Sequence, residues 1–415
     1  MRILIYGLNY EPEWVGTGKF TGEMARYLAQ SGHAVHVVTA PPYYPTWRIR
    51  PGYSAWRYRR ETLGGVDVIR CPLWVPRHPS GLTRLLHLLS FALSSAPALL
   101  VQASWHPQLI LAVAPTLAAA PAAWLSARLF GCPAWLHIQD FELEAALRLE
   151  MLPGMRPLAR LLQQAESWLL NRFDHLSTIS ARMQERLWHQ GIPAHKTSLL
   201  PNWVDCDEIF PHPGPHSYRE QWDIPMDKIL LLYAGSMGEK QGLELIIQAA
   251  RQLQADPRLQ FVLCGAGSSR QRLEELAAGL DNVRFVPLQP PEALTYLLHA
   301  ADIHLLVQRP AAADLVMPSK LTGMLASGRP VLATAEPDTE LARVVSQVGI
   351  CVPPENLDAF CQAVQQLAAQ PDLRARLGNL GRLYAEEHLD RRLVLSRLEA
   401  ELRRAVLKDP PQTPV

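Results

Sequence analysis

The same local pattern occurs twice in the chain: a short apolar strand, then a turn that contains glycines, then a helix. The first copy begins with the predicted strand Arg2–Gly7, and its loop ends at Gly16-Thr17-Gly18, where apolar residues take up helical spacing. The second copy begins at Ile229–Ala234 and continues through a turn at residues 235–242, GSMGEKQG. Each copy leads to a further predicted strand, so each is a βαβ unit. The repeated pattern therefore predicts two doubly wound α/β domains.

The length of the chain agrees with two domains. At 415 residues it exceeds the usual size of a single hydrophobic core. A run rich in proline and histidine follows residues 199–205 and is the best place for a boundary. We therefore expect an N-terminal domain over residues 1–202 and a C-terminal domain over residues 203–388. A helix is expected over residues 389–408, and a disordered, proline-rich tail over residues 409–415.

Composition argues against several classes of protein. The 40 lysines and arginines balance the 39 aspartates and glutamates, so no net field attracts nucleic acid. The six cysteines show neither a C-x-x-C pair nor metal-ligand spacing, which is typical of reduced thiols in the cytosol. The N-terminal strand lacks the apolar length and the cleavage site of a signal peptide. We expect a cytoplasmic protein without a metal site or a cofactor.

One long stretch of the first domain carries no charge. No charged residue occurs between Arg84 and Arg128, a span long enough to cross a bilayer. Prolines interrupt this span at positions 97, 107, 115 and 121. Alternating buried strands and helices therefore explain it better than a transmembrane helix does. The apolar predicted helix Leu82–Leu100 leaves a peripheral membrane contact open.

Two segments of the second domain are candidate phosphate sites. Lys240 lies in the glycine-rich turn after the strand Ile229–Ala234, and Pro318-Ser319-Lys320 opens the predicted helix Leu321–Ala326. A helix N-terminus offers free amide N–H groups and partial positive charge to an anion, and each lysine adds a full charge. Ordinary αβ connections with solvated lysines would give the same patterns. A third glycine-rich turn, Gly265–Arg270, has arginine where a dinucleotide fingerprint needs its third glycine, which argues against NAD binding.

Two segments of the first domain are candidate sugar contacts. The predicted loop Pro41–Arg60 interleaves aromatic residues with arginines, and such a surface suits sugar rings, phosphates or single-stranded nucleic acid. A solvated loop held by its aromatic residues is the alternative. The predicted strand Ala134–Asp140 delivers His137 and Asp140 to its carboxyl end, where α/β sheets place ligand groups. A structural histidine would fit that pattern equally well.

Several longer motifs occur in one order along almost the whole chain: Gly16-Thr17-Gly18, His137, the junction LPNWVD at residues 200–205, Gly265-Ala266-Gly267 and the ending SGRPV at residues 327–331. Together they resemble the GT-B family of retaining glycosyltransferases, group four. Five longer segments are similar to bacterial colanic-acid-type fucosyltransferases and L-fucosamine transferases. They are "APPYYPTW", "RCPLWVP", "HIQDFE", "YAGSMGEKQGLE" and "MPSKLTGMLASGRPV".

The resemblance implies two Rossmann-like domains that face a deep cleft, with the C-terminal helix crossing back to the first domain. It implies that His137 faces the transferred sugar and that Lys240 and Lys320 stabilise the leaving diphosphate. It assigns the following residues to donor binding: Gly16, Thr17, Gly18, Gly235, Ser236, Gly265, Gly267, Asp314, Pro318, Ser319 and Leu321. The aromatic and basic loop supplies acceptor contacts at Tyr43, Tyr44, Trp47 and Arg48, and Asp140 joins them.

The chain departs from the family at one point. The family has two glutamates spaced eight apart before its "A-x-G-x-P" ending, and alignment on Gly328 puts Leu315 and Gly323 at these positions. Asp314 stands next to the first of them and is the candidate replacement carboxylate.

The implied reaction transfers a glycosyl group from a GDP- or UDP-linked donor to a polyprenyl-diphosphate-linked saccharide at the inner membrane. Retention implies attack on the face that the diphosphate leaves, and the chain shows no carboxylate pair typical of a hydrolase. Two rivals remain: a sugar-nucleotide epimerase of the same fold, and a non-catalytic sugar-nucleotide-binding partner in an assembly complex.

Overall fold

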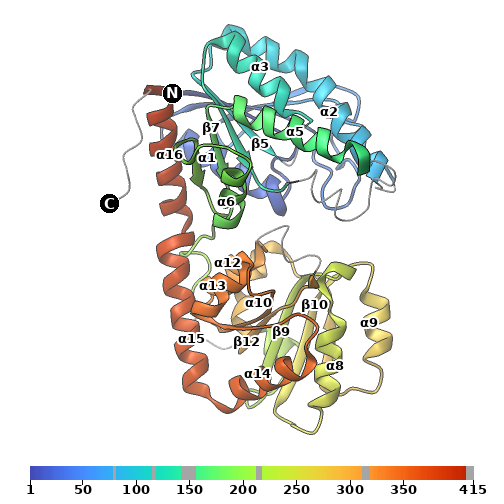
Figure 1. Ribbon diagram of the computed structural model, residues 1–415. Helices are drawn as coiled ribbons and strands as arrows, with labels where there is room; N and C mark the ends of the chain where they lie inside the picture. The colour runs from blue at the N-terminus through green and yellow to red at the C-terminus, as the bar shows by residue number, and fades with distance from the viewer. Residues whose placement is uncertain (78–80, 115–117, 142–155, 212–216, 311–317, 408–415) are drawn as a thin grey trace. The chain divides into compact units, whose positions relative to one another are not determined.

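Figure 1 shows the chain as a computed structural model. The structure describes residues 1–77, 81–114, 118–141, 156–211, 217–310 and 318–407. The chain forms two compact units. One consists of Met1–Pro201 together with Leu395–Val415, and the other consists of Asn202–Val394.

An eight-stranded sheet forms the centre of the first unit, in the order β3-β4-β2-β1-β5-β6-β7-β8. Neighbouring strands are parallel, except that β3 and β4 pair antiparallel. The strands are β1 (Arg2–Gly7), β2 (Ala34–Thr39), β3 (Arg59–Leu63), β4 (Val66–Arg70), β5 (Leu109–Ala114), β6 (Ala134–Ile138), β7 (His175–Thr178) and β8 (Thr197–Leu199).

The order of this sheet reverses at β1. The chain runs from β1 outward to β2 and β4, and then crosses back to β5 on the other side of β1. Doubly wound sheets bind ligands beyond the carboxyl ends of the strands at such a reversal. The loop from Leu8 to Val15, which leads into α1, starts at this point.

Helices cover both faces of the first sheet. They are α1 (Gly16–Gln30), α2 (Gly81–Val101), α3 (Ala120–Phe130), α5 (Arg156–Arg172) and α6 (Ala181–His189), with short 3₁₀ turns η1 (Gln102–Trp105) and η2 (Ala194–Lys196). Helices α2, α3 and α5 lie side by side on one face (Figure 1). The step from β1 to β2 goes in the opposite direction across the sheet from the steps that α2, α3 and α5 make. A right-handed crossover therefore puts α1 on the other face.

The last part of helix α16 (Arg391–Leu407) belongs to the first unit. The amino group of Met1 lies 3.0 Å from Nδ1 of His33, and Nε2 of His33 lies 2.9 Å from a carboxylate oxygen of Glu399. The first residue of the chain and its last helix are therefore joined through one buried histidine.

The second unit is built on a six-stranded parallel sheet in the order β11-β10-β9-β12-β13-β14 (Figure 1). The strands are β9 (Ile229–Ser236), β10 (Leu259–Ala266), β11 (Val283–Val286), β12 (Ile303–Leu306), β13 (Val331–Thr334) and β14 (Ile350–Val352). The order reverses at β9, so the glycine-rich turn after β9 lies at the reversal point of this sheet. Buried apolar residues of β9, β10 and α14 form the largest core of this unit.

The helices of the second unit are α7 (Ser217–Gln221), α8 (Glu244–Gln252), α9 (Arg270–Leu276), α10 (Leu294–Ala300), α12 (Lys320–Ala326), α13 (Glu340–Val348), α14 (Leu357–Ala369) and α15 (Pro371–Tyr384). Arg382 of α15 connects three parts of this unit. Its guanidinium donates to the carbonyl oxygens of Ile209 at 2.6 Å, Ala326 at 2.9 Å and Cys206 at 2.9 Å. One side chain thus donates hydrogen bonds to carbonyl groups at the end of α12 and in the segment that enters the unit.

The predicted fold class, two doubly wound α/β domains, is confirmed, but two local predictions were wrong. The predicted loop Pro41–Arg60 ends earlier, because Arg59 and Arg60 begin β3, which a two-residue turn at Gly64-Gly65 joins to β4. The predicted strand Ala134–Asp140 ends at Ile138, so Asp140 follows it.

We expect Arg382→Met to lower the free energy of unfolding of the second unit by about 3 kcal/mol, because it leaves three carbonyl groups without their charged donor. Arg376→Met, at an exposed position of the same helix, is the matched control. Chemical denaturation measures both, and equal unfolding midpoints for the two variants would contradict the role assigned to Arg382.

Candidate functional site

The carboxyl ends of β9 and β10 approach each other closely at glycines. Gly235 pairs with Gly265 in the register of the two strands. A Cβ added to Gly265 would lie 1.8 Å from the carbonyl oxygen of Gly235, and one added to Gly267 would lie 2.2 Å from that of Met237. No side chain fits in either place, so the backbone itself forms this end of the sheet.

Lys320 fills the space that Gly235 leaves open. A Cβ on Gly235 would lie 2.3 Å from both Cε and Nζ of Lys320, so the lysine depends on this glycine. Its Nζ donates a hydrogen bond of 2.9 Å to the hydroxyl of Tyr233 and lies 4.5 Å from the centre of that ring. The Tyr233 hydroxyl in turn donates to the carbonyl oxygen of Ser236. The predicted residues Gly235, Ser236, Gly265 and Lys320 are therefore brought together.

The ammonium group of Lys320 has only neutral partners among the described residues, where no ion pair to it is formed. Burial lowers the pKa of Lys320 to about 8. An ammonium held by a phenol and a ring face lacks the full counter-charge that a phosphate group would supply. The arrangement is suited to binding an anion at the reversal point of the second sheet.

The other predicted donor residues of this unit contribute less from their side chains. Lys240 is exposed in the 3₁₀ turn η3 (Glu239–Gln241), and its carbonyl oxygen accepts a 3.0 Å hydrogen bond from the amide of Arg309. Leu321 is fully buried, so only its backbone could meet a ligand. Ser319 is exposed and Pro318 is half-buried directly before α12, and Asp314 lies outside the described residues.

Gly323, where the family carries its second glutamate, faces the core. A Cβ at this position would lie 3.2 Å from Cδ1 of Leu298 and 3.7 Å from Cδ1 of Ile209. A carboxylate at Gly323 would therefore meet apolar side chains. Leu315, at the position of the first glutamate, lies outside the described residues.

The glycine-bearing loop of the first unit packs around a buried carboxylate. Glu13 is 3% exposed, and its Oε1 accepts hydrogen bonds of 2.9 Å from the amides of both Tyr43 and Tyr44. Its Oε2 accepts another, also of 2.9 Å, from the side-chain amide of Asn9, and burial raises the pKa of its carboxyl group. A Cβ on Gly18 would lie 2.7 Å from this side chain. Gly18 therefore makes room for Glu13.

The neighbouring predicted residues lie on both sides of this carboxylate. Gly16 begins α1 with a positive φ of 61°, and a Cβ there would lie 3.7 Å from the ring of Tyr44; Thr17 follows it in the first turn. The ring of Tyr44 is 41% exposed. Glu13 thus holds the turn before α1 and the start of the aromatic loop together.

Two aromatic residues of the loop, Tyr43 and Trp47, pack against α2. Tyr43 is buried, and its ring centre lies 4.8 Å from that of His87 and 5.5 Å from that of Trp47. The guanidinium of Arg84 lies 5.5 Å from the Trp47 ring. Arg48 is exposed. Of the four predicted acceptor residues in the loop, Tyr44 and Arg48 present their side chains to solvent, and Tyr43 and Trp47 anchor the loop.

His137 lies within β6 and is only 2% exposed. Its Nδ1 lies 3.0 Å from the hydroxyl of Ser177, and its Nε2 lies 2.8 Å from the side-chain nitrogen of Gln139. Burial lowers its pKa to about 4, so the imidazole is neutral at physiological pH. A sugar could reach Nε2 only if Gln139 gave way. Asp140 follows the strand, and its charge acts on Arg186.

Two residues that the sequence did not single out belong to these clusters. Tyr233 lies in the apolar strand β9, where it and the last residue, Ser236, carry the only polar side-chain groups. Glu13 lies between Trp14 and the proline at position 12. The sequence of this loop does not show which way the Glu13 side chain points. Among the described residues, no three His, Cys, Asp or Glu side chains gather as a metal site requires.

Comparisons with known proteins agree with this geometry. Residues 15–203 match the model of the "Glycosyl transferase 4-like domain", and residues 216–384 match that of "Glycosyl transferases group 1". The chain is 43% identical over 413 residues to an Escherichia coli (strain K12) protein that bears the provisional name colanic acid biosynthesis glycosyl transferase WcaI. The match covers 97% of this chain and all of that protein.

The chain belongs to glycosyltransferase family 4. Solved structures with the same fold include sucrose-phosphate synthase from Thermosynechococcus elongatus, with a TM-score of 0.77 and 19% identity over 99% of this chain and 100% of the other. HepE from Anabaena, solved in complex with UDP, has a TM-score of 0.71 and 15% identity over 97% of this chain and 100% of that chain. The predicted GT-B fold is confirmed by these neighbours.

For this glycosyltransferase we expect nucleoside diphosphate affinity to fall as pH rises through about 8, where Lys320 loses its proton. In Tyr233→Phe the ammonium loses its hydrogen-bond acceptor, so the pKa of Lys320 should fall further and the decline should start about one pH unit lower. Calorimetric titration of UDP and GDP between pH 6 and pH 10 measures this shift.

Tyr218→Phe is the matched control, because Tyr218 also donates to a side chain of this unit, Gln289, at 3.0 Å. We expect its pH profile to equal that of the wild type. Coincident profiles for Tyr233→Phe and the wild type would show that Tyr233 does not position the lysine.

Proposed function

We propose that this protein is a retaining glycosyltransferase of exopolysaccharide biosynthesis. It moves L-fucose or an N-acetylated amino sugar from a nucleoside diphosphate to a polyprenyl-diphosphate-linked saccharide. The observation that carries the proposal is the half-buried Lys320, whose ammonium is held against Gly235 by Tyr233 without a counter-charge from a described residue. The name of the Escherichia coli relative supports a role in colanic-acid-type polysaccharide assembly.

The proposed reaction depends more on positive charge beside the leaving diphosphate than on a side-chain base. The bond between C1 of the sugar and the diphosphate oxygen breaks, and the acceptor oxygen bonds to C1 on the same face. The proton of the acceptor hydroxyl passes to the departing phosphate. Negative charge grows on the diphosphate, and Lys320, Lys240 and the amides beside Gly235 would stabilise it without a metal ion.

The donor is a GDP- or UDP-linked sugar. HepE, which shares the fold, has been solved with UDP and with UDP-glucose, and this supports a nucleotide-sugar substrate. We assign the diphosphate to Lys320, Ser319 and the turn after β9. The transferred sugar is assigned to His137. The acceptor is assigned to Tyr44 and Arg48, the exposed members of the aromatic loop.

We expect Lys320→Ala to lower kcat/KM by a factor of about 100 to 1,000, as the loss of one charge-stabilising donor does in other enzymes. Turnover is measured as release of UDP or GDP in the presence of lipid-linked acceptor, after thermal stabilisation by a panel of nucleotide sugars has identified the donor. Lys196→Ala, a half-buried lysine in η2 of the first unit, is the control.

Two results would overturn the assignment. Near-wild-type turnover in Lys320→Ala would remove Lys320 from the reaction. Conversion of the nucleotide sugar into an isomer, with no acceptor present and no diphosphate released, would identify an epimerase. Full activity after treatment with EDTA is expected, and its loss would contradict a metal-independent transfer.

We further propose that the first unit rests on the inner membrane from the cytoplasmic side. Helix α2 exposes one stripe of leucines at positions 85, 86, 89, 93 and 100, and the adjacent α3 exposes Leu125 and Leu129. The segment Thr83–Trp105 is long and apolar enough to cross a bilayer. However, Phe91 and Leu99 of α2 are fully buried within the unit, which favours a helix that lies on the surface.

The charge of these helices favours an anionic surface. Neither α2 nor α3 contains an acidic residue, and the one acid of α5, Glu166, is buried. Trp168 of α5 is 53% exposed, and the guanidinium of Arg172 lies 4.7 Å from its ring centre. Exposed leucines and a tryptophan beside arginines are typical of peripheral contacts with anionic lipids.

We expect the wild-type protein to sediment with phosphatidylglycerol vesicles at low salt. The double variant Leu93→Glu, Leu129→Glu should bind about tenfold or more weakly, since it removes two exposed leucines and adds repulsion. The control is Met226→Glu with Leu383→Glu, two exposed apolar positions of the second unit. A wild type that ignores these vesicles, or a control that loses binding equally, would contradict the proposed face.

A further inference from the structure

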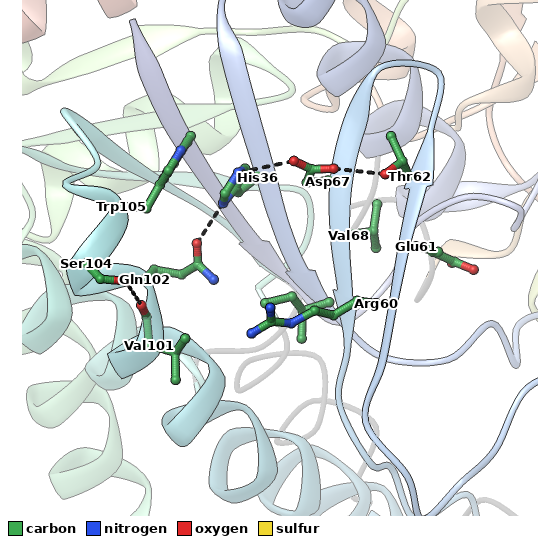
Figure 2. Close-up of a pocket in the computed structure, with 11 residues that line it drawn as sticks. His36, Arg60, Glu61, Thr62, Asp67, Val68, Val101, Gln102, Ser104 and Trp105 are labelled. Carbon is green, nitrogen blue, oxygen red and sulfur yellow. Dashed lines mark hydrogen bonds and ion pairs between the residues drawn. The ribbon is translucent and has the colours of Figure 1, made fainter.

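A hollow of about 430 Å³ opens on the first unit beside the end of α2 (Figure 2). Its floor is one face of three strands, on which His36 of β2 pairs with Asp67 of β4 and Asp67 pairs with Thr62 of β3. Arg60 of β3 lies on the same face, opposite Ile69. The wall consists of Val101, the last residue of α2, and of Gln102, Ser104 and Trp105 from η1.

This hollow is separate from the end of the sheet where the glycine-bearing loop begins. His36 is the third residue of β2 and Asp67 the second residue of β4, so both lie toward the amino ends of these parallel strands. The loop with Glu13 and the turn at Gly16 follow the carboxyl end of β1. A ligand in the hollow would therefore occupy a different place from one bound at the sheet reversal.

A chain of hydrogen bonds fixes the polar floor. Thr62 donates to Asp67 at 2.9 Å, and the other oxygen of Asp67 lies 3.4 Å from Nε2 of His36. Nδ1 of His36 lies 2.8 Å from Oε1 of Gln102, and the imidazole stacks on Trp105 with ring centres 3.6 Å apart and planes within 8°. The side chains around the hollow are thus held in place before any ligand arrives.

Two strong donors in the hollow are left over. Gln102 is only 4% exposed, and since its oxygen faces His36, its amide N–H₂ group is turned toward the hollow (Figure 2). Arg60 makes no hydrogen bond or ion pair with a described residue, and Figure 2 shows its guanidinium reaching from β3 toward Gln102 and Val101. By contrast, the nearby carboxylate of Glu61 is already paired with Arg70 at 2.8 Å and Arg59 at 3.2 Å.

We propose that this hollow is a second, non-catalytic saccharide site that binds a sugar unit carrying a carboxylate. The guanidinium of Arg60 and the amide of Gln102 donate to the carboxylate. Asp67 accepts hydrogen bonds from the ring hydroxyls, and Val101 and the edge of Trp105 contact the apolar face of the sugar. The proposal rests on the proposed function only for its choice of a saccharide, because a polysaccharide-assembling enzyme handles saccharides.

The carboxylate group is what distinguishes this ligand from others. A neutral sugar would leave the guanidinium of Arg60 without a partner. Inorganic phosphate would satisfy Arg60 and Gln102, but it lacks the several hydroxyl donors and the apolar face of a sugar ring, and its doubly charged form would be repelled by Asp67 more strongly than a single carboxylate. A sugar acid matches donors on one side of the hollow and an acceptor on the other.

Saturation-transfer NMR with D-glucuronate, D-glucose and inorganic phosphate as probes tests the site. We expect glucuronate to saturate the wild type with a Kd of about 1 mM, as a single charged sugar unit of this size should. Arg60→Gln should weaken this binding about tenfold or more, because it removes the charged donor and keeps a side chain of similar length. Arg57→Gln, an exposed arginine that does not line the hollow, should bind like the wild type.

Several results would overturn the proposal: no saturable glucuronate signal in the wild type, equal affinity in Arg60→Gln, or phosphate or glucose binding as tightly as glucuronate. Titration of the identified nucleotide sugar in the same samples separates this outcome from failure of the proposed function. Loss of glucuronate binding alone with retained nucleotide-sugar binding rejects only the hollow. The reverse result rejects the donor assignment and leaves the hollow supported.

Discussion

Holding the ammonium of the half-buried Lys320 without a counter-charge from a described residue is the constraint on which the second unit's site depends. Tyr233 offers a hydroxyl and a ring face, and Gly235 offers the space. Because the Tyr233 hydroxyl donates to the carbonyl of Ser236, its lone pair is directed at the lysine. Any larger residue at position 235 would displace Nζ of Lys320. The arrangement therefore requires the glycine at position 235, the tyrosine of β9 and the lysine at the start of α12 together.

The first unit also buries a charged side chain among neutral hydrogen-bond partners, in this case a carboxylate. The carboxylate of Glu13 is buried, and its described partners are two backbone amides and the amide of Asn9. These neutral donors join the loop after β1 to the start of the aromatic loop. Gly18 is required because the carboxylate packs directly against its backbone. The geometry of the exposed ring of Tyr44 therefore follows from one buried acid.

The sequence predicted the parts of this arrangement that have a local cause. Apolar runs and glycine turns located β1, β9 and the helix after Lys320, since strand period and turn chemistry are written in neighbouring residues. Tyr233 was out of reach, because a tyrosine in an apolar strand looks like core until a partner 87 residues away is known. The contact between Gly18 and Glu13 was out of reach for the same reason, because Glu13 approaches Gly18 only in the folded loop.

Buried charges elsewhere in the chain are neutralised differently, and this contrast separates structural groups from ligand groups. Arg70 is 1% exposed and pairs with Glu61, and Arg219 is 2% exposed and pairs with Asp302. A buried charge normally needs such a partner, because desolvation costs several kcal/mol per ion. Lys320 lies at the sheet reversal of the second unit, and its partner among the described residues, Tyr233, is neutral. The fold tolerates this cost where an incoming ligand can complete the set of charges, so the unpaired lysine marks the anion site more firmly than the glycines around it do.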